Sequence, residues 1–212
     1  MKILKPAEAG PGPALRLTLG DSNPDVAAAL ADAFRGAGAV SVVEGDLLDM
    51  DCQAVVSPAN SFGDMGGGID KAIDDHLGGE AQRCVRAAIA ERFLGELPVG
   101  AALVVVVRRG RMGTVVAAPT MRVPGRVGGT LNAYLAMRAA LVAVIVHNST
   151  APEPVRSLAV PGLCTGVGGM PCAEAAGQLR AAYDNVIGGG WRRVAHPAMA
   201  PYPLHEPGGG RR

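Results

Sequence analysis

The feature that most constrains the fold is the stretch from residue 42 to residue 73, VVEGDLLDMDCQAVVSPANSFGDMGGGIDKAI. Its pattern indicates a strand, a polar loop, a short buried strand, a glycine-rich loop and the first turn of a helix. The second strand is followed by Asn60, then by three glycines, then by Asp70. This order places backbone N–H groups, an amide and a carboxylate around one small cleft. Such a cleft suits a phosphorylated ligand that carries a ribose better than it suits a metal ion or a nucleic acid duplex.

Strands alternate with helices along most of the chain. Apolar runs predict strands at 15–19, 40–44, 53–57, 101–107, 113–118 and 157–160. A first helix is expected to begin at Pro24 and to stop at Gly36, and further helices are expected at 69–77, 80–93, 130–146 and 171–187. Residues 15–19 (LRLTL) alternate like an edge strand. The whole pattern predicts a three-layer α/β/α fold around a mixed, mainly parallel central sheet.

The composition bounds the size and the class of the protein. A chain of 212 residues, 49% of them hydrophobic, can bury the core of one large domain. We expect a flexible segment at 1–14, a single domain at 15–188 and an irregular Gly-, Pro- and Arg-rich tail at 189–212. With 20 basic and 19 acidic residues there is no basic excess, which argues against nucleic acid as a partner. The sequence has no run of eighteen apolar residues and no signal-peptide pattern, so we expect no membrane span and a cytoplasmic location.

Metal and thiol chemistry find little support in the sequence. The four cysteines form no Cys-x-x-Cys pair, and buried, reduced thiols are the default interpretation. Cys164 lies in a glycine-rich loop and is the cysteine to watch for reactivity. His76 follows Asp74 and Asp75, but adjacent positions of a helix point in different directions. We therefore expect neither a metal site nor a bound cofactor.

Three segments follow strands directly, and the ligands of open α/β sheets bind where strands end. In the first segment, Gly45-Asp46-Leu47, the carboxylate of Asp46 can accept a hydrogen bond from an exocyclic amine such as that of adenine. The alternative for Asp46 is a turn or a helix cap. In the second, Asn60 offers both a donor and an acceptor to a ribose diol, and Asp70 can orient or deprotonate a water beside the ligand. The alternative for Asp70 is a helix-start residue that the helix dipole favours.

The third segment is GLCTGVGGMP, residues 162–171, between a strand and a helix. Successive backbone N–H groups at a helix N-terminus form a cradle for an anion. The segment is not a Walker loop, because the Gly-Lys-Ser/Thr ending is missing, and it is not a dinucleotide-type glycine fingerprint. One glycine-rich loop is weak evidence, but two such loops after two strands of one sheet indicate a phosphate-binding site.

Taken together, the segments EGDLLD, SPANSFGDMGGGID and GLCTGVGGMP resemble the macrodomain family, which binds ADP-ribose, over roughly residues 40–188. The resemblance implies that Asp46 accepts from the adenine amine and that the Leu47 backbone meets the ring. It implies that Asn60 holds the distal ribose. The other ligand-binding residues that it implies are Gly67, Gly68, Ile69, Cys164, Thr165, Gly166, Val167, Gly168, Gly169 and Met170. In the branch of the family that hydrolyses ADP-ribose from proteins, an Asp follows the glycine run, and Asp70 occupies that place.

The chain departs from the family pattern in both loops. Ser57 stands where the first Asn of the usual loop would be, and Pro58, which lacks an N–H, follows it. The diphosphate loop has Gly168, Gly169 and Met170 in a region that often carries an aromatic residue. This leaves the distal end of the predicted site more open.

Three functions agree with this pattern. The first is a hydrolase that cleaves the bond at the distal ribose C1″ of an ADP-ribosylated protein, O-acetyl-ADP-ribose or ADP-ribose 1″-phosphate, with Asp70 and Asn60 as the catalytic residues. The second is a reader that binds ADP-ribose without turnover. The third is a scaffold that only inherits the fold.

Overall fold

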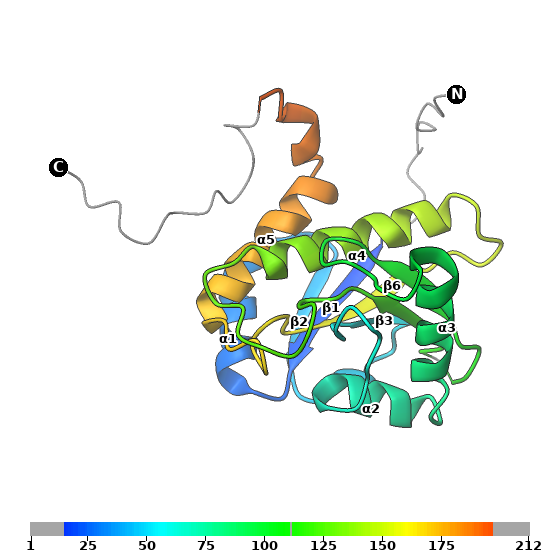
Figure 1. Cartoon of the computed structure of the whole chain (residues 1–212). Helices are drawn as coiled ribbons and strands as arrows, with labels where there is room; N and C mark the ends of the chain where they lie inside the picture. The colour runs from blue at the N-terminus through cyan, green and yellow to red at the C-terminus, as the bar shows by residue number, and fades with distance from the viewer. Residues whose placement is uncertain (1–14, 111, 197–212) are drawn as a thin grey trace.

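The computed structural model describes residues 15–110 and 112–196, which form a central sheet between two layers of helices (Figure 1). The six strands of the sheet are β1 (Arg16–Asp21), β2 (Val40–Glu44), β3 (Ala54–Ser57), β4 (Leu103–Val106), β5 (Thr114–Ala117) and β6 (Ser157–Pro161). Their order is β2-β1-β6-β3-β5-β4, and only the pair of β4 and β5 is antiparallel. The predicted three-layer fold with a mixed, mainly parallel sheet is confirmed.

Helices cover both faces of the sheet. They are α1 (Pro24–Ala33), α2 (Gly68–His76), α3 (Ala81–Phe93), α4 (Asn132–Asn148) and α5 (Cys172–Val186), with short 3-10 segments η1 (Leu47–Asp49) and η2 (Gly190–Arg193). Side chains of α1, α4 and α5 share one core with Val56 and Val116, whereas α2 and α3 share the other with Val55 and Val115. Neighbouring residues of one strand therefore enter opposite cores, as the pleat requires.

The prediction that residues 15–19 form an edge strand is wrong. β1 lies inside the sheet, paired in parallel with β2 on one side and β6 on the other, and β2 is the edge. Leu17 and Leu19 are fully buried against the α1, α4 and α5 side. The alternation arises because residues on the opposite face of β1 are less buried: Thr18 is partly exposed, and its hydroxyl accepts from the Cys52 thiol. The alternating sequence therefore reflects a strand with one buried face and one partly exposed face, and not a strand at the edge of the sheet.

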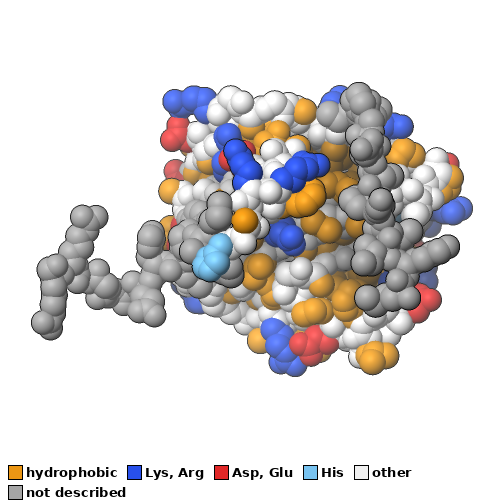
Figure 2. All heavy atoms as spheres, turned by 90° about the horizontal axis from the view of Figure 1, so that it is seen from above, with side chains coloured by type: hydrophobic (Ala, Val, Ile, Leu, Met, Phe, Trp, Pro, Cys, Tyr) orange, Lys and Arg blue, Asp and Glu red, His pale blue; other side chains and the backbone are white. Residues whose placement is uncertain are grey.

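The face formed by α4 and α5 is shown from above in Figure 2, where hydrophobic side chains are exposed around a few basic ones. On α4, Ile145 and Val146 are 46% and 62% exposed, while its opposite side packs into the core. This helix is therefore apolar over most of its circumference. Among the described residues, none of the helices combines the length and the hydrophobicity that a transmembrane span requires.

The ends of the chain were predicted to be irregular. Residues 1–14 and 197–212 lie outside the described part of the structure. Within the predicted tail, η2 is ordered as one 3-10 turn, and the guanidinium of Arg192 lies 4.6 Å from the centre of the Trp191 ring. Trp191 is 50% exposed, so it stands on the surface.

The topology determines where a ligand can bind. The carboxyl ends of β1, β2, β3 and β6 lie at the same edge of the sheet because these strands are parallel. β6 leads into α5 on one face, whereas its neighbour β3 leads into α2 on the other. Such a divergence opens a crevice between the two loops that follow the strands.

Candidate functional site

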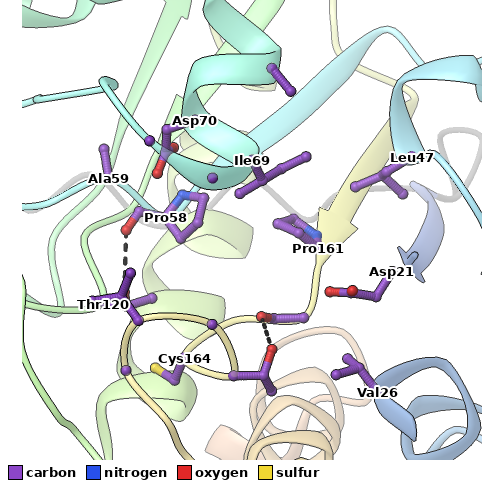
Figure 3. Close-up of a pocket in the computed structure, with 18 of the residues that line it drawn as sticks. Asp21, Val26, Leu47, Pro58, Ala59, Ile69, Asp70, Thr120, Pro161 and Cys164 are labelled. Carbon is purple, nitrogen blue, oxygen red and sulfur yellow. Dashed lines mark hydrogen bonds between the residues drawn. The ribbon is translucent and has the colours of Figure 1, made fainter. Parts of the chain in front are cut away.

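A cavity of about 710 Å³ lies at this edge of the sheet (Figure 3). Its wall consists of the turns that follow β1, β2, β3 and β6, together with part of the loop between β5 and α4. Figure 3 shows Asp70 and Ala59 at one end, and Asp21 and Leu47 at the other. The volume suits a ligand the size of a dinucleotide.

Most of the residues predicted for the site lie on this cavity. They are Asp46, Leu47, Asn60, Gly67, Gly68, Ile69, Asp70, Cys164, Thr165, Gly166, Val167 and Gly168. Gly169 and Met170 do not line it. Met170 is buried, and its backbone N–H donates to the carbonyl of Cys164 at 3.0 Å, so it closes the loop from behind.

Asp70 stands on the first turn of α2, and its carboxylate is held from β3. The hydroxyl of Ser57, which is fully buried, donates to Oδ1 of Asp70 at 2.6 Å. Burial raises the pKa of Asp70 from 3.8 to about 6, and the hydrogen bonds from Ser57 and from the Ala59 N–H oppose this rise. The charge of Asp64 raises the pKa slightly further. Asp70 is therefore a carboxylate at pH 7 with more basicity than an exposed one.

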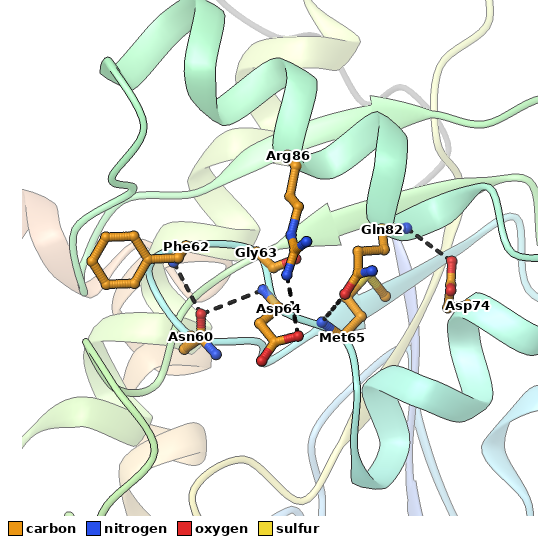
Figure 4. A network of polar contacts seen from close by, with 8 residues as sticks. All are labelled: Asn60, Phe62, Gly63, Asp64, Met65, Asp74, Gln82 and Arg86. Carbon is orange, nitrogen blue, oxygen red and sulfur yellow. Dashed lines mark hydrogen bonds and ion pairs between the residues drawn. The ribbon is translucent and has the colours of Figure 1, made fainter.

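Asn60 folds the loop that precedes the glycines (Figure 4). Its side-chain oxygen accepts hydrogen bonds from the backbone N–H groups of Phe62, at 3.0 Å, and Asp64, at 3.3 Å. The carbonyl half of the amide is thus occupied within the protein, and the amide nitrogen is the group that can serve a ligand. Asn60 thus lines the cavity and also shapes its own loop.

The same loop is tied to α3. The Arg86 side chain donates to the Gly63 carbonyl and to Asp64, each at 3.2 Å, and Gln82 accepts from the Met65 N–H at 2.8 Å (Figure 4). Gln82 in turn is held through its backbone N–H by Asp74, at 2.9 Å. These contacts hold the backbone before α2 in one conformation, which is what a pre-formed binding site needs.

The three glycines after this loop form a wall without side chains. A Cβ atom on Gly67 or Gly68 would meet no atom of the described residues within 4 Å, so the backbone stands open towards the cavity. Gly68 has φ +56, which favours glycine, and Gly67 caps α2 without a side-chain hydrogen bond. The first N–H groups of α2 are therefore available to an anion.

The loop after β6 faces those glycines from the other side of the crevice. A Cβ on Gly168 would lie 2.5 Å from the Cys164 carbonyl oxygen and 2.7 Å from a methyl group of Val127, so only glycine fits there. The Val127 N–H donates to the Gly168 carbonyl at 2.9 Å, and the Thr165 hydroxyl donates to the Gly162 carbonyl at 2.8 Å. The loop is compact, and among residues 162–170 only Gly166 and Val167 are exposed, Val167 by 69%.

Cys164 was the cysteine to watch for reactivity, but the structure agrees with the default interpretation of a buried thiol. The side chain is buried, and burial raises the pKa of its thiol to about 12 despite a hydrogen bond from Thr120. Because the thiolate is the reactive form, this thiol is inert at neutral pH. Cys164 also has φ +70, so it serves the loop through its backbone conformation.

The far end of the cavity holds two carboxylates. Asp46 is exposed and accepts from the Leu48 N–H at 2.9 Å as the cap of η1, which is the alternative role considered for it, while it also lines the cavity. Asp21, the last residue of β1, was missed by the sequence analysis, as were Ser22 and Asn23, which follow it. The signal that finds them is the parallel pairing of β1, which carries its end to the same edge.

The structure is a three-layer α/β/α domain with a crevice between two glycine-rich loops at the carboxyl edge of its sheet. The macro domain family model matches residues 56–179, more than half of the chain. An uncharacterised protein of Aquifex aeolicus is 35% identical over 137 residues, 65% of this chain and 76% of that protein. One of Aeropyrum pernix is 32% identical over 156 residues, 73% of this chain and 75% of that protein. The chain therefore belongs to the macro domain family.

Solved macrodomains share the fold at low sequence identity. The Oceanobacillus iheyensis macrodomain with ADP has a TM-score of 0.55 and 24% identity, covering 68% of this chain and 73% of its own. The macrodomain of Mycobacterium tuberculosis DarG has a TM-score of 0.52 and 24% identity, covering 66% of this chain and 87% of its own.

Proposed function

We propose that the protein binds ADP-ribose or an ADP-ribosyl group in the cavity at the carboxyl edge. The observation that carries the proposal is that both glycine-rich loops face one cavity from opposite sides. The diphosphate lies between the Gly66–Gly68 backbone and the rim formed by Thr165 to Gly168, where N–H groups and the N-terminus of α2 supply its counter-charge. The adenine lies at the Asp46 end and the distal ribose at the Asn60 and Asp70 end.

We further propose that the protein hydrolyses the bond at the distal ribose C1″. Asp70 takes a proton from a water, and the water oxygen forms a bond to C1″. The bond from C1″ to the leaving group breaks with its electron pair going to the leaving group, which then takes the proton from Asp70. The raised pKa of Asp70 supports this role, because a general base is most effective when its pKa approaches the working pH. Asn60 holds the ribose through its amide nitrogen. Candidate substrates are an ADP-ribosylated protein, O-acetyl-ADP-ribose and ADP-ribose 1″-phosphate.

Calorimetry with ADP-ribose tests the binding, and release of free ADP-ribose from the three substrates tests the turnover. The wild type is compared with Asp70→Asn, which keeps the shape of the side chain and its acceptor for Ser57. Asp75→Asn on the exposed side of α2 is the control, because Asp75 pairs with Lys71 on the surface. We expect Asp70→Asn to bind and to release ADP-ribose at least about a hundredfold more slowly. Equal rates remove Asp70 from the reaction, and absence of binding to the wild type refutes the whole proposal.

A reader without turnover is favoured by one observation. The diphosphate loop places Gly168, Gly169 and Met170 where the family often has an aromatic residue, so the distal end lacks that cover. Tight binding of ADP-ribose, with no product released from any of the three substrates, would show that the protein is a reader and not a hydrolase.

A further inference from the structure

The end of β1 adds the acidic side chain of Asp21 to the cavity wall, outside the residues that the family model matches. The matched segment begins at residue 56, whereas Asp21, Ser22, Asn23 and Val26 all line the cavity. Figure 3 shows the carboxylate of Asp21 directed towards the cavity from the end opposite Asp70. This part of the wall is therefore a feature of the chain beyond its matched family core.

The register of the sheet places Asp21 between two parts of the proposed ligand. Asp21 pairs with Glu44, immediately before Gly45-Asp46, and Gly20 pairs with Pro161, immediately before the diphosphate loop. Oδ2 of Asp21 lies only 2.8 Å from the point where a Cβ on Gly162 would stand, so the carboxylate contacts the start of that loop. In a nucleoside diphosphate, the ribose lies between the base and the phosphates. Asp21 is thus placed beside the nucleoside ribose.

The carboxylate is held in place by its own turn. Oδ1 of Asp21 accepts from the Asn23 N–H at 2.9 Å, and the Asn23 side chain accepts from the Asp25 N–H at 3.0 Å to cap α1. With Oδ1 held in this way, Oδ2 is positioned before any ligand arrives. A carboxylate accepts hydrogen bonds and donates none, so its partner must carry hydroxyl or amine hydrogens, and a phosphate is repelled.

We propose that Asp21 accepts hydrogen bonds from the vicinal hydroxyls of the nucleoside ribose and thereby excludes ligands that carry a phosphate on those hydroxyls. This inference rests on the proposed function and deepens it, because it limits the substrate class to ADP-ribosyl groups whose nucleoside ribose carries no phosphate on its 2′- or 3′-hydroxyl. Asp21 is a specificity-determining residue at a distance from the reacting C1″.

The test is calorimetric titration of the full chain with ADP-ribose and with 2′-phospho-ADP-ribose. We expect the wild type to bind the 2′-phosphate form at least about a hundredfold more weakly, since juxtaposed like charges are strongly unfavourable. In Asp21→Asn the affinities for ADP-ribose and for 2′-phospho-ADP-ribose should differ by about tenfold or less. The amide oxygen of the new side chain still accepts from the Asn23 N–H, but it carries no charge that repels the phosphate. Asp25→Asn removes the same charge from an exposed residue outside the cavity wall and should behave like the wild type.

A second measurement needs no variant. The wild type should bind 2′-deoxy-ADP-ribose about tenfold more weakly than ADP-ribose, because a hydrogen bond to a charged acceptor is lost. Equal affinity for the deoxy form, or a 2′-phosphate difference that Asp21→Asn leaves unchanged, overturns the assignment of Asp21 while ADP-ribose binding stands. If ADP-ribose itself fails to bind to the wild type, the proposed function falls instead.

Discussion

Replacing Ser57 by Ala should make the carboxyl group of Asp70 a weaker acid. Burial raises the pKa of Asp70 to about 6, and the hydrogen bond from the Ser57 hydroxyl, at 2.6 Å, opposes that rise by stabilising the ionised form. The variant removes this donor, leaves the burial unchanged and keeps the hydrogen bond from the Ala59 N–H. The pKa must therefore move upwards.

The size of the change follows from the energy of such a bond. A hydrogen bond to a charged group contributes about 1.5–3 kcal/mol, and one pKa unit corresponds to about 1.36 kcal/mol. Losing the Ser57 donor should thus raise the pKa of Asp70 by about one to two units, to about 7 or 8. At pH 7 the side chain would change from largely ionised to half or largely protonated.

Carbon-detected NMR of the Asp70 carboxyl group, titrated from pH 4 to 9, measures this pKa without any assumption about turnover. If the protein is a hydrolase, the acidic limb of its pH–rate profile should move by the same amount. Ser61→Ala is the matched control, because the Ser61 hydroxyl is also buried but has no hydrogen-bond partner among the described residues. A pKa that stays at about 6 in Ser57→Ala, or that falls, refutes the reasoning.

Four further variants test the electrostatics and the two loops. Asp70→Asn should raise the free energy of unfolding by about 3 kcal/mol at pH 7.5 but by little at pH 4, as urea titration can measure. The direction follows because Asp70 has a higher pKa in the folded protein than in the unfolded chain. The stability that its protonated form contributes is fully present below pH 3.8 and is lost as the pH rises through about 6, so the neutral Asn is the better residue only at higher pH. A stability gain in Asp70→Asn that does not depend on pH would contradict this explanation. Asn60→Asp keeps the acceptor that folds its loop but loses the amide donor, so ADP-ribose affinity should fall at least about tenfold while the melting temperature changes little; a large loss of stability would show that Asn60 is mainly structural. Gly168→Ala should cost about 1–3 kcal/mol through overpacking. At Gly166 a Cβ would meet no atom of the described residues within 4 Å, so Gly166→Ala should lower the free energy of unfolding by less than about 1 kcal/mol. Thermal melts of both variants measure these losses, and equal losses of stability in the two variants would contradict the geometry of the loop.

Most of the fold could be predicted because its signals are local. Asn23 and Pro24 mark the start of α1, and the apolar run Ala54–Ser57 is the short buried strand that its composition indicates. The position of β1 could not be predicted. A strand with one half-covered face shows the same alternation as an unpaired edge, and only the pairing of β1 with β2 and β6 distinguishes the two.

The sequence likewise predicted some features of the candidate site and not others. The two glycine-rich loops were visible in the sequence, because backbone that approaches a ligand closely needs glycine at particular positions such as Gly168. The inert state of Cys164 and the raised pKa of Asp70 were not visible, because both depend on burial by distant residues. Asp21 was missed because the sequence does not show that β1 lies between β2 and β6, which brings its end to the cavity.

The sequence by itself determined the elements, the order of the motifs and the resemblance to the macrodomain family, since propensity, glycine placement and apolar periodicity act over a few residues. Only the tertiary structure decided which strand ends share an edge, and therefore that Asp21, Asp46 and Asp70 face one cavity. Desolvation and charge act through space, so the acidity of a side chain depends on neighbours that the chain brings together from far along its length.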